Sequence, residues 1–314
     1  MEDNTTSNKT WNSVNNSYPR KIPEICTGNI KLSLNFFICV VCILGLVGNG
    51  TVIWLLGFRI KRNPFTTYIL NLAVADFGLL ISLPLSLIIL CQKFPTYILW
   101  ISFNILYILS LVFYSIGQLL LTAISVDRCV SVLFPIWYRC HRPPKLSTIV
   151  CVFIWVLSSV FNGIPIVLLM SLNWYFEAIT YQFIVNTVFC LPFIIISTFI
   201  LFIRVCFKSQ QHRRGKILIV VLLSLLFYLL FAFPLNAVYL IVVYFQFPVN
   251  FNYLKECLHL STSLNSSVNP FIYFLVGRKK RRQSRQSMKV LLQRVFKEEQ
   301  VPGAEEEHPL ETRL

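Results

Sequence analysis

The chain has 314 residues, of which 56% are hydrophobic and only 13% are charged, and its mean hydropathy is +0.67. A soluble domain of this size would be about 25% charged, so this composition excludes an ordinary soluble protein and indicates one that crosses a membrane many times. The net charge of +15 does not indicate binding to nucleic acid, because the basic residues lie between apolar runs and not on one soluble face.

Apolar runs of spanning length recur along the chain, each near the roughly 20 residues that a bilayer helix needs. The runs are continuous and do not alternate with polar residues, which favours helices over barrel strands. We therefore predict an all-α membrane protein, a seven-transmembrane helix bundle, with spans at 30–58, 66–91, 98–131, 147–171, 179–207, 216–246 and 254–276. Residues 1–29 are expected to form an N-terminal tail, 30–276 the transmembrane domain and 277–314 the C-terminal segment.

The basic residues predict the orientation of this bundle. Of the 28 Lys and Arg residues, 22 lie in the C-terminal segment or in the loops and span ends on the same side of the membrane as that segment. Because basic residues are retained on the cytoplasmic side, we expect the C-terminus inside the cell and the N-terminus outside. Glycosylation sequons in the N-terminal tail agree with this orientation at Asn4, Asn8 and Asn15. We expect a multi-pass protein of the plasma membrane.

Polar side chains interrupt several of the predicted spans. Asn49 lies in the first span and Asp76 in the second, whereas Asp127 and Arg128 stand side by side near the end of the third. A carboxylate at the depth of Asp76 needs a cation, a proton or several hydrogen-bond donors, so we interpret it as functional. A lone polar residue such as Asn49 is also explained by a bond to a neighbouring helix.

The triplet Asp127-Arg128-Cys129 resembles the Asp-Arg-Tyr signature of rhodopsin-like G-protein-coupled receptors. The sequence PIWYRCHRP, which follows from Pro135, is similar to the second intracellular loop of the Mas-related branch of that family. The resemblance covers all the predicted spans. It implies a receptor that transmits an extracellular ligand to a heterotrimeric G protein, with coupling residues Asp127, Arg128, Pro135, Ile136 and Tyr138.

The same resemblance implies an activation switch formed by Asn49, Asp76, Pro234, Asn265, Asn269, Pro270 and Tyr273. Several positions depart from the family pattern, and three of them concern this switch. Arg214 stands where the family has an acid that locks the third-span arginine, Ala232 replaces the sixth-span tryptophan, and Gly117 replaces a serine that ligates sodium. We expect appreciable ligand-independent signalling, because an inactive state without its ion pair lies closer in free energy to the active state.

The outer side of the predicted bundle offers fewer signals. The family's usual disulfide is absent, since Phe103 occupies its third-span position, and our expected pair is Cys26 with Cys257, although spacing does not establish connectivity. The position of the aspartate in amine receptors is Ser110, which argues against an amine. We expect a peptide or a small amphipathic ligand, with pocket residues Tyr107, Ser110, Glu177 and Tyr239. Aromatic residues in interfacial belts are an equally good reading.

Two features follow the seventh span. Apolar residues recur at helical spacing among bases near Met288, which predicts a short amphipathic helix on the cytoplasmic face, lying on anionic lipid, although a disordered basic tail also fits. The chain ends with Thr312 and Leu314 in a pattern that suits the groove of a PDZ domain.

The alternative function is a membrane transporter or channel. Such proteins show repeated halves or several charged residues along a pathway, whereas here Asp76 alone lies deep in a span and no repeat is visible. We see no metal-ligand spacing and no nucleophile motif, so we predict neither an enzyme nor a bound cofactor.

Overall fold

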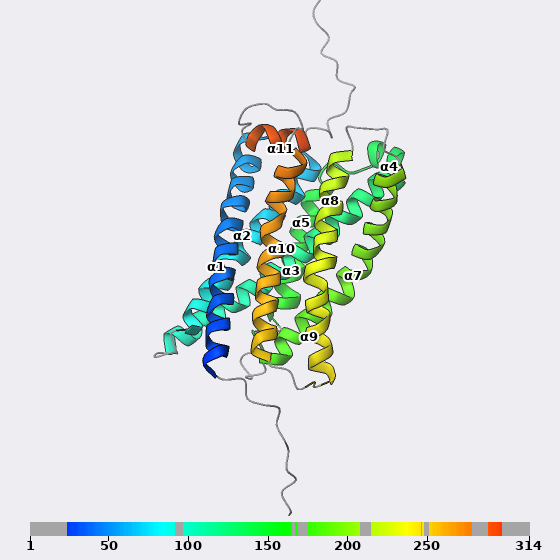
Figure 1. Cartoon of the computed structure of the whole chain (residues 1–314). Helices are drawn as coiled ribbons and strands as arrows, with labels where there is room; N and C mark the ends of the chain where they lie inside the picture. Colours follow the sequence, from blue (N-terminus) through cyan, green and yellow to red (C-terminus); the bar gives the residue numbers. More distant parts are fainter. Residues whose placement is uncertain are drawn as a thin grey trace, which may run out of the picture.

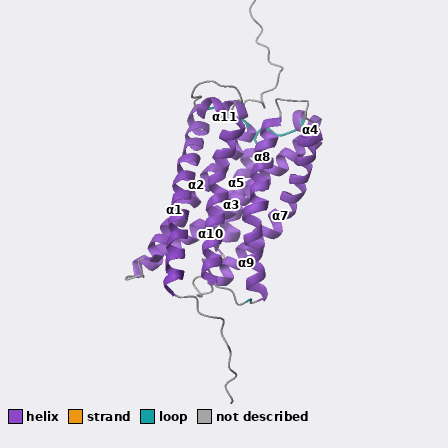
Figure 2. Cartoon of the chain, viewed as in Figure 1, coloured by secondary structure: helices purple, strands orange, loops and turns teal. Residues whose placement is uncertain are grey.

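The computed structural model describes residues 24–91, 97–164, 167–168, 175–207, 215–245, 247, 251–277 and 288–296. Over these residues the regular secondary structure is entirely helical (Figure 2). The elements are α1 (Glu24–Trp54), η1 (Leu55–Arg59), α2 (Pro64–Cys91), α3 (Tyr97–Leu133), α4 (Pro135–Cys140), α5 (Leu146–Ser158), η2 (Ser159–Gly163), α7 (Tyr175–Phe207), α8 (Gly215–Phe227), η3 (Tyr228–Ala232), α9 (Phe233–Phe245), α10 (Phe251–Gly277) and α11 (Met288–Phe296). The prediction of an all-α protein is confirmed.

Consecutive elements join end to end into long helical segments, which we call rods, and the rods lie side by side (Figure 1). The first rod is α1 with η1, the fourth is α5 with η2, and the sixth is α8 with η3 and α9, whereas α2, α3, α7 and α10 each form a rod alone. Within the described residues, each predicted span coincides largely with one rod. The short helices α4 and α11 lie at the same end of the bundle, which we call the α4–α11 end, and α1 begins at the opposite end.

The fourth rod has a shorter apolar helix than the other rods, and the seventh rod is less apolar. Among the described residues, five stretches are long and apolar enough to cross a membrane, namely Leu32–Arg59, Pro64–Ile89, Tyr97–Leu133, Asn186–Cys206 and Lys216–Phe245. Helix α5 is apolar but shorter. Helix α10 is 27 residues long, but it carries polar residues, among them Ser261, Ser263 and Asn265, which are buried against the other helices. Its outward residues Phe271 and Leu275 are apolar, so a polar sequence still suits a helix within this bundle.

Helix α3 forms the centre of the bundle and contacts α2, α5, α7 and α8. Two apolar clusters surround it. The larger one includes Phe65, Ile124 and Leu201, and the smaller one includes Phe183 and Leu258. Large apolar side chains also cover the outside of the rods, as expected where lipid replaces water.

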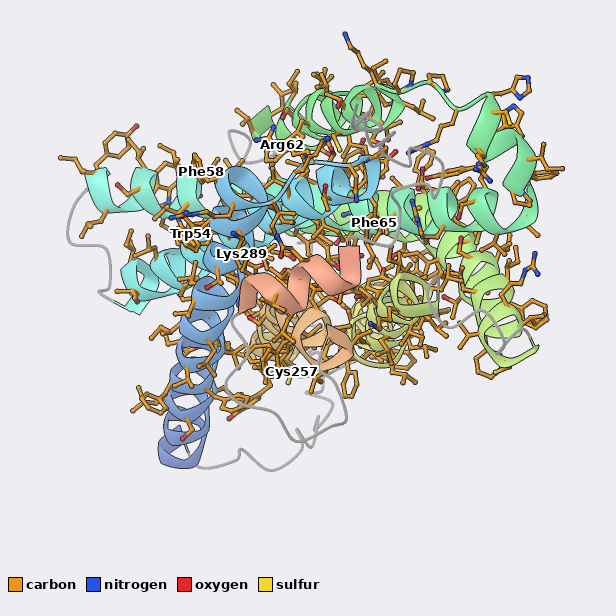
Figure 3. All side chains as sticks on the ribbon, turned by 90° about the horizontal axis from the view of Figure 1, so that it is seen from above. Trp54, Phe58, Arg62, Phe65, Cys257 and Lys289 are labelled. Atoms are coloured by element: carbon orange, nitrogen blue, oxygen red, sulfur yellow. The ribbon has the colours of Figure 1, made fainter. Side chains whose placement is uncertain are left out.

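Helix α11 packs against the end of the seventh rod. Its residues Leu291, Leu292 and Val295 are buried, and the helix contacts α10 and α8. A Cβ atom added to Gly277 would lie 2.9 Å from the carbonyl oxygen of Leu291, so this approach requires glycine. Seen from above, α11 lies flat across the end of the bundle (Figure 3).

Candidate functional site

The turn between α3 and α4 brings a side chain of α4 back to the last turns of α3. Helix α3 ends at Leu133 because Pro135 cannot continue the ladder of backbone hydrogen bonds. Pro135 is instead the first residue of α4, where its missing N–H is not needed. The chain folds back at this point, and Tyr138 of α4 reaches Asp127 and Arg128 of α3.

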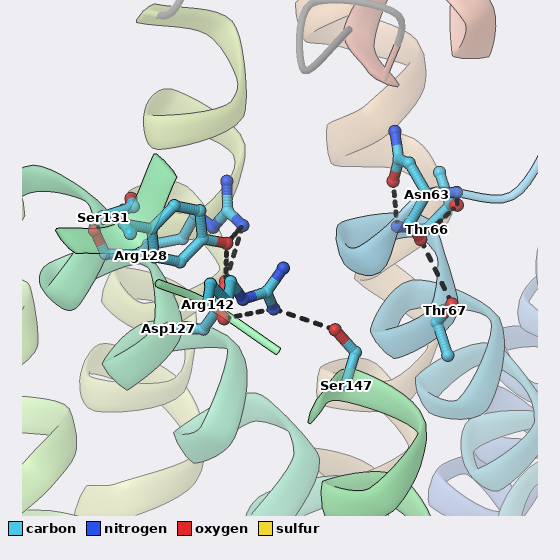
Figure 4. A network of polar contacts seen from close by, with 9 residues as sticks. Asn63, Thr66, Thr67, Asp127, Arg128, Ser131, Arg142 and Ser147 are labelled. Atoms are coloured by element: carbon cyan, nitrogen blue, oxygen red, sulfur yellow. Dashed lines mark hydrogen bonds and ion pairs between the residues drawn. The ribbon is translucent and has the colours of Figure 1, made fainter. Parts of the chain in front are cut away.

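Asp127 accepts hydrogen bonds at both carboxylate oxygens. Its Oδ2 accepts from the Arg128 Nη2 at 2.5 Å and from the Tyr138 hydroxyl at 2.9 Å. Its Oδ1 accepts from the Arg142 Nη2 at 2.7 Å. One buried carboxylate is therefore shared by two guanidinium groups, as Figure 4 shows.

Arg128 is held on several sides. Its Nη2 also donates to the Tyr138 hydroxyl at 2.8 Å. Its guanidinium carbon lies 4.6 Å from the ring centre of Phe65, a fully buried residue at the start of α2. A cation over an aromatic face is attracted by the ring quadrupole, and the attraction is larger where water is excluded. Only 5% of the Arg128 side chain is exposed.

Arg142 reaches the same carboxylate from the segment between α4 and α5. Its Nη2 donates to the Ser147 hydroxyl at 2.8 Å, and its guanidinium carbon lies 4.6 Å from the ring centre of Tyr138. Its side chain is 7% exposed. We call the whole group the Asp127 cluster, and its members are Phe65, Asp127, Arg128, Tyr138, Arg142 and Ser147.

The structure thus joins three of the five predicted coupling residues, Asp127, Arg128 and Tyr138. Pro135 begins α4, and Ile136 is 79% exposed and is not a member of the cluster. Ile136 shares an exposed apolar surface with Leu133, Phe134 and Trp137. Sequence reasoning missed Phe65, Arg142 and Ser147, because nothing in the sequence separates Arg142 from its exposed neighbour Arg139.

Helix α7 also supports the end of α3. The Nη2 of Arg204 donates to the carbonyl oxygen of Val132 at 2.8 Å. This carbonyl belongs to the last turn of α3, where backbone acceptors have no partner within the helix. Arg204 therefore fixes the terminal turn of α3 close to Arg128.

A second group of polar residues crosses the middle of the bundle. Asn269 donates to the Asp76 Oδ2 at 3.0 Å and joins α10 to α2. Asn49 donates to the carbonyl oxygens of Gly45 and Ser266, each at 3.0 Å, and joins α1 to α10. These contacts bring together much of the predicted activation switch.

Beside Asp76 the bundle has a cavity of about 10 Å³, which is about the space that one water molecule needs. Asp76, Gly117, Gln118, Asn265 and Asn269 contribute to its lining. A Cβ atom added to Gly117 would lie 3.6 Å from the Asp76 Oδ1, so a serine here would bring its hydroxyl close to the carboxylate. Glycine supplies no such oxygen, and the residues present therefore do not complete the sodium site implied by the family resemblance.

The other predicted switch residues lie in α9 and α10. Pro270 lies within α10, and Tyr273 follows it and is buried. Pro234 is the second residue of α9, directly after the π-helical turn η3. A π-helical turn of this kind is often found at functional sites.

The end of the bundle opposite the α4–α11 end holds a mixed polar and aromatic group. The Lys255 Nζ lies 5.1 Å from the ring centre of Tyr107, and the ring of His259 meets that of Tyr107 edge-on at 6.2 Å. The Glu256 Oε2 lies 3.8 Å from the His259 Nδ1, and both residues are buried. Charges of both signs therefore surround Tyr107.

The predicted pocket residues are only partly grouped there. Tyr239 is buried and packs its ring 5.2 Å from that of Phe183. Ser110 is buried, but its hydroxyl donates to the Tyr107 carbonyl at 2.7 Å within α3. The side chain of Glu177 lies outside the described residues. Sequence reasoning gave Lys255 and His259 no role in this pocket. Their contacts with Tyr107 arise because α10 packs beside α3, which the sequence does not reveal.

The predicted disulfide pair lies partly outside the described residues. Cys257 has a free thiol, and the side chain of Cys26 lies outside the described residues. The predicted glycosylation sites Asn4, Asn8 and Asn15 and the PDZ-type residues Thr312 and Leu314 also lie outside them.

Comparison with known proteins identifies the family of this chain. Residues 48–273 match the model of the 7 transmembrane receptor (rhodopsin family). Proto-oncogene Mas of Rattus norvegicus is 35% identical over 274 residues, which cover 84% of this chain and 83% of that protein. Mas-related G-protein coupled receptor member H of Rattus norvegicus is 38% identical over 276 residues, covering 85% and 84%. Member D of Homo sapiens is 38% identical over 267 residues, covering 82% and 83%.

Proposed function

Since the chain belongs to the Mas-related branch of the rhodopsin family of seven-transmembrane receptors, it is a G-protein-coupled receptor, and we propose that it engages its G protein through Arg128. It is a multi-pass membrane protein that responds to an extracellular ligand.

The observation that carries the proposal is the environment of Arg128. Burying a guanidinium group at the end of a membrane helix costs free energy unless the group is paired. Charged residues at such positions usually serve a function. Arg128 is paired with Asp127 at the α4–α11 end, directly beside the exposed apolar residues of α4. An apolar surface next to a releasable charge suits a partner protein that binds by burying Ile136 and contacting Arg128.

The orientation that we propose places the α4–α11 end in the cytosol. The Asp127 cluster, the Arg204 contact and α11 all lie at this end, and α1 begins at the other one (Figure 1). The excess of Lys and Arg on this side supports the same orientation. In this arrangement α11 lies where anionic lipid headgroups would meet its basic residues, so we keep the predicted lipid contact as part of the proposal.

We assign the ligand to the opposite end, around Tyr107. Lys255, Glu256 and His259 provide both signs of charge, and Tyr239 with Phe183 provides an aromatic surface. A ligand with charged and apolar parts, such as a peptide or a small amphipathic molecule, would satisfy both kinds of contact. A PDZ-domain partner at Leu314 remains a proposal from the sequence alone.

The proposal is tested by replacing Arg128 with alanine in cells that express matched amounts of receptor at the surface. We expect Arg128→Ala to abolish G-protein signalling in every second-messenger readout that the wild type activates, because the contact with the G protein is lost. Arg139→Ala, which removes an exposed charge from the same end, is the control and is expected to signal normally. Normal signalling by Arg128→Ala would refute the proposal.

A further inference from the structure

The Asp127 cluster has one more cation than its carboxylate needs. In the described structure Arg128 and Arg142 both donate to Asp127, at 2.5 Å and 2.7 Å, and use different oxygens. All three side chains are at least nine-tenths buried. Water therefore screens these charges poorly, and each guanidinium group repels the other while both are attracted to Asp127.

The two arginines are held in different ways. Arg142 has contacts that do not involve Arg128, namely the hydrogen bond to the Ser147 hydroxyl at 2.8 Å and the ring of Tyr138 at 4.6 Å. Ser147 is buried near the start of α5, so this anchor belongs to a different rod from Arg128. Arg142 can therefore stay in place when Arg128 turns toward a G protein.

Departure of Arg128 would otherwise leave a costly group behind. A buried carboxylate without a cation is strongly unfavourable, because the interior does not replace its hydration. Tyr138 supplies one neutral donor to Asp127, which does not balance a full charge. With Arg142 present, Asp127 keeps an ion pair of its own in both states.

We propose that Arg142 is a positioning residue that acts as a standby counter-ion of Asp127 and thereby makes the release of Arg128 easier. This inference rests on the proposed role of Arg128 in coupling. Arg142 acts in two ways, and both favour the release of Arg128 from Asp127. Its charge weakens the hold of Asp127 on Arg128 in the resting state, and it stabilises the Asp127 carboxylate once Arg128 has left.

The sign of this effect separates the proposal from a simpler one. If Arg142 only stabilised the resting cluster, its loss would weaken the contacts that hold Arg128 and would raise basal signalling. If Arg142 is the standby counter-ion, its loss leaves Asp127 with Arg128 alone, the pair tightens, and basal signalling falls. The two views therefore predict opposite results for the same substitution.

The test measures agonist-free nucleotide exchange on purified G proteins of each class, in membranes with matched receptor content. We expect Arg142→Gln to lower the exchange rate about tenfold relative to the wild type, a coupling within the usual range between linked sites. Arg139→Gln removes the same charge from an exposed position of α4 and is expected to match the wild type. A rate for Arg142→Gln equal to or above that of the wild type would overturn the proposal.

A double variant checks that the effect passes through Asp127. In the Asp127→Asn background the carboxylate is gone, so adding Arg142→Gln should change the exchange rate less than twofold, as expected when the shared partner is absent. A tenfold fall in that background as well would show that Arg142 acts elsewhere, and would also overturn the proposal. Ser147→Ala, which removes the anchor of Arg142, should lower exchange in the same direction by a smaller factor.

Failure of this inference and failure of the proposed function give different patterns. If Arg128→Ala signals normally, the role of Arg128 is wrong, whatever Arg142→Gln does. If Arg128→Ala is silent but Arg142→Gln behaves like Arg139→Gln, the coupling role stands and the standby counter-ion is refuted. Melting temperatures of the purified variants complete the test. A fall in exchange counts for the proposal only if Arg142→Gln remains folded at the assay temperature.

Discussion

Asp127 sets the charge balance at the α4–α11 end, because two guanidinium groups compete for one carboxylate. The adjacent acid and arginine were predictable from the sequence, since a charged pair at the end of an apolar run is conspicuous. Phe65 and Arg142 were not predictable. Arg139 and Arg142 are both loop bases in the sequence, and only the fold turns Arg142 inward and leaves Arg139 exposed.

Another buried contact, between Asn236 and Tyr114, makes a prediction at the same scale. The Asn236 Nδ2 donates to the Tyr114 hydroxyl at 2.7 Å, and both residues are buried. In Tyr114→Phe the amide loses its acceptor, which should cost about 1–3 kcal/mol and lower the melting temperature of the detergent-solubilised receptor. Tyr244→Phe, at a residue that is 81% exposed, serves as the control and should not change it. Equal melting temperatures for the two variants would show that this hydrogen bond does not stabilise the bundle.

At the scale of the elements, apolar runs predicted the rods, but not their internal geometry. The run at 216–246 becomes α8, η3 and α9, and no sequence signal marked the π-helical turn before Pro234. Helix α10 was predicted as a span although it carries many polar residues. Its polarity is explained by burial, since Ser263, Ser266 and Asn269 face other helices and not lipid.

The contact between α1 and α10 supplies an element-scale prediction. A Cβ atom added to Gly45 would overlap the Oγ of Ser267, which donates to the Val41 carbonyl at 3.1 Å. Gly45→Ala must therefore displace Ser267 and separate the two helices slightly, at a cost of about 1–3 kcal/mol, as overpacking typically does. Gly57→Ala is the matched control, because nothing lies within 4 Å of its added Cβ atom.

The measurement for this pair is again the melting temperature of the solubilised receptor. Gly45→Ala should melt lower than the wild type, whereas Gly57→Ala should melt at the same temperature or slightly higher, since alanine favours the helix. An unchanged melting temperature for Gly45→Ala would mean that the two helices approach less closely than the structure shows.

At the scale of the whole molecule, the polarity of the bundle gives each end a different chemistry. The α4–α11 end has a buried charge cluster beside an exposed apolar surface, and the opposite end has aromatic rings with charges around Tyr107. Composition and base distribution predicted that the ends differ. They did not predict which side chains meet, because contacts such as Phe65 with Arg128 join residues far apart in sequence.

The proposed orientation is tested with epitope tags and a glycosidase. A tag before residue 1 should be detected on intact cells, and a tag after residue 314 only after the cells are permeabilised. Replacement of Asn4, Asn8 and Asn15 with glutamine should remove the mobility shift that the glycosidase causes, because glycans are added only on the lumenal side. Detection of the C-terminal tag on intact cells would reverse the orientation and the assignment of both ends.

The most direct measurement of the central claim is nucleotide exchange with the receptor purified in lipid discs and G proteins of each class. We predict that the wild type accelerates exchange on at least one class without agonist, as expected if Arg214 stands where the family has the acid that locks the third-span arginine. We also predict that Arg128→Ala abolishes this acceleration while Arg139→Ala preserves it. Acceleration by Arg128→Ala at the wild-type rate would contradict the account.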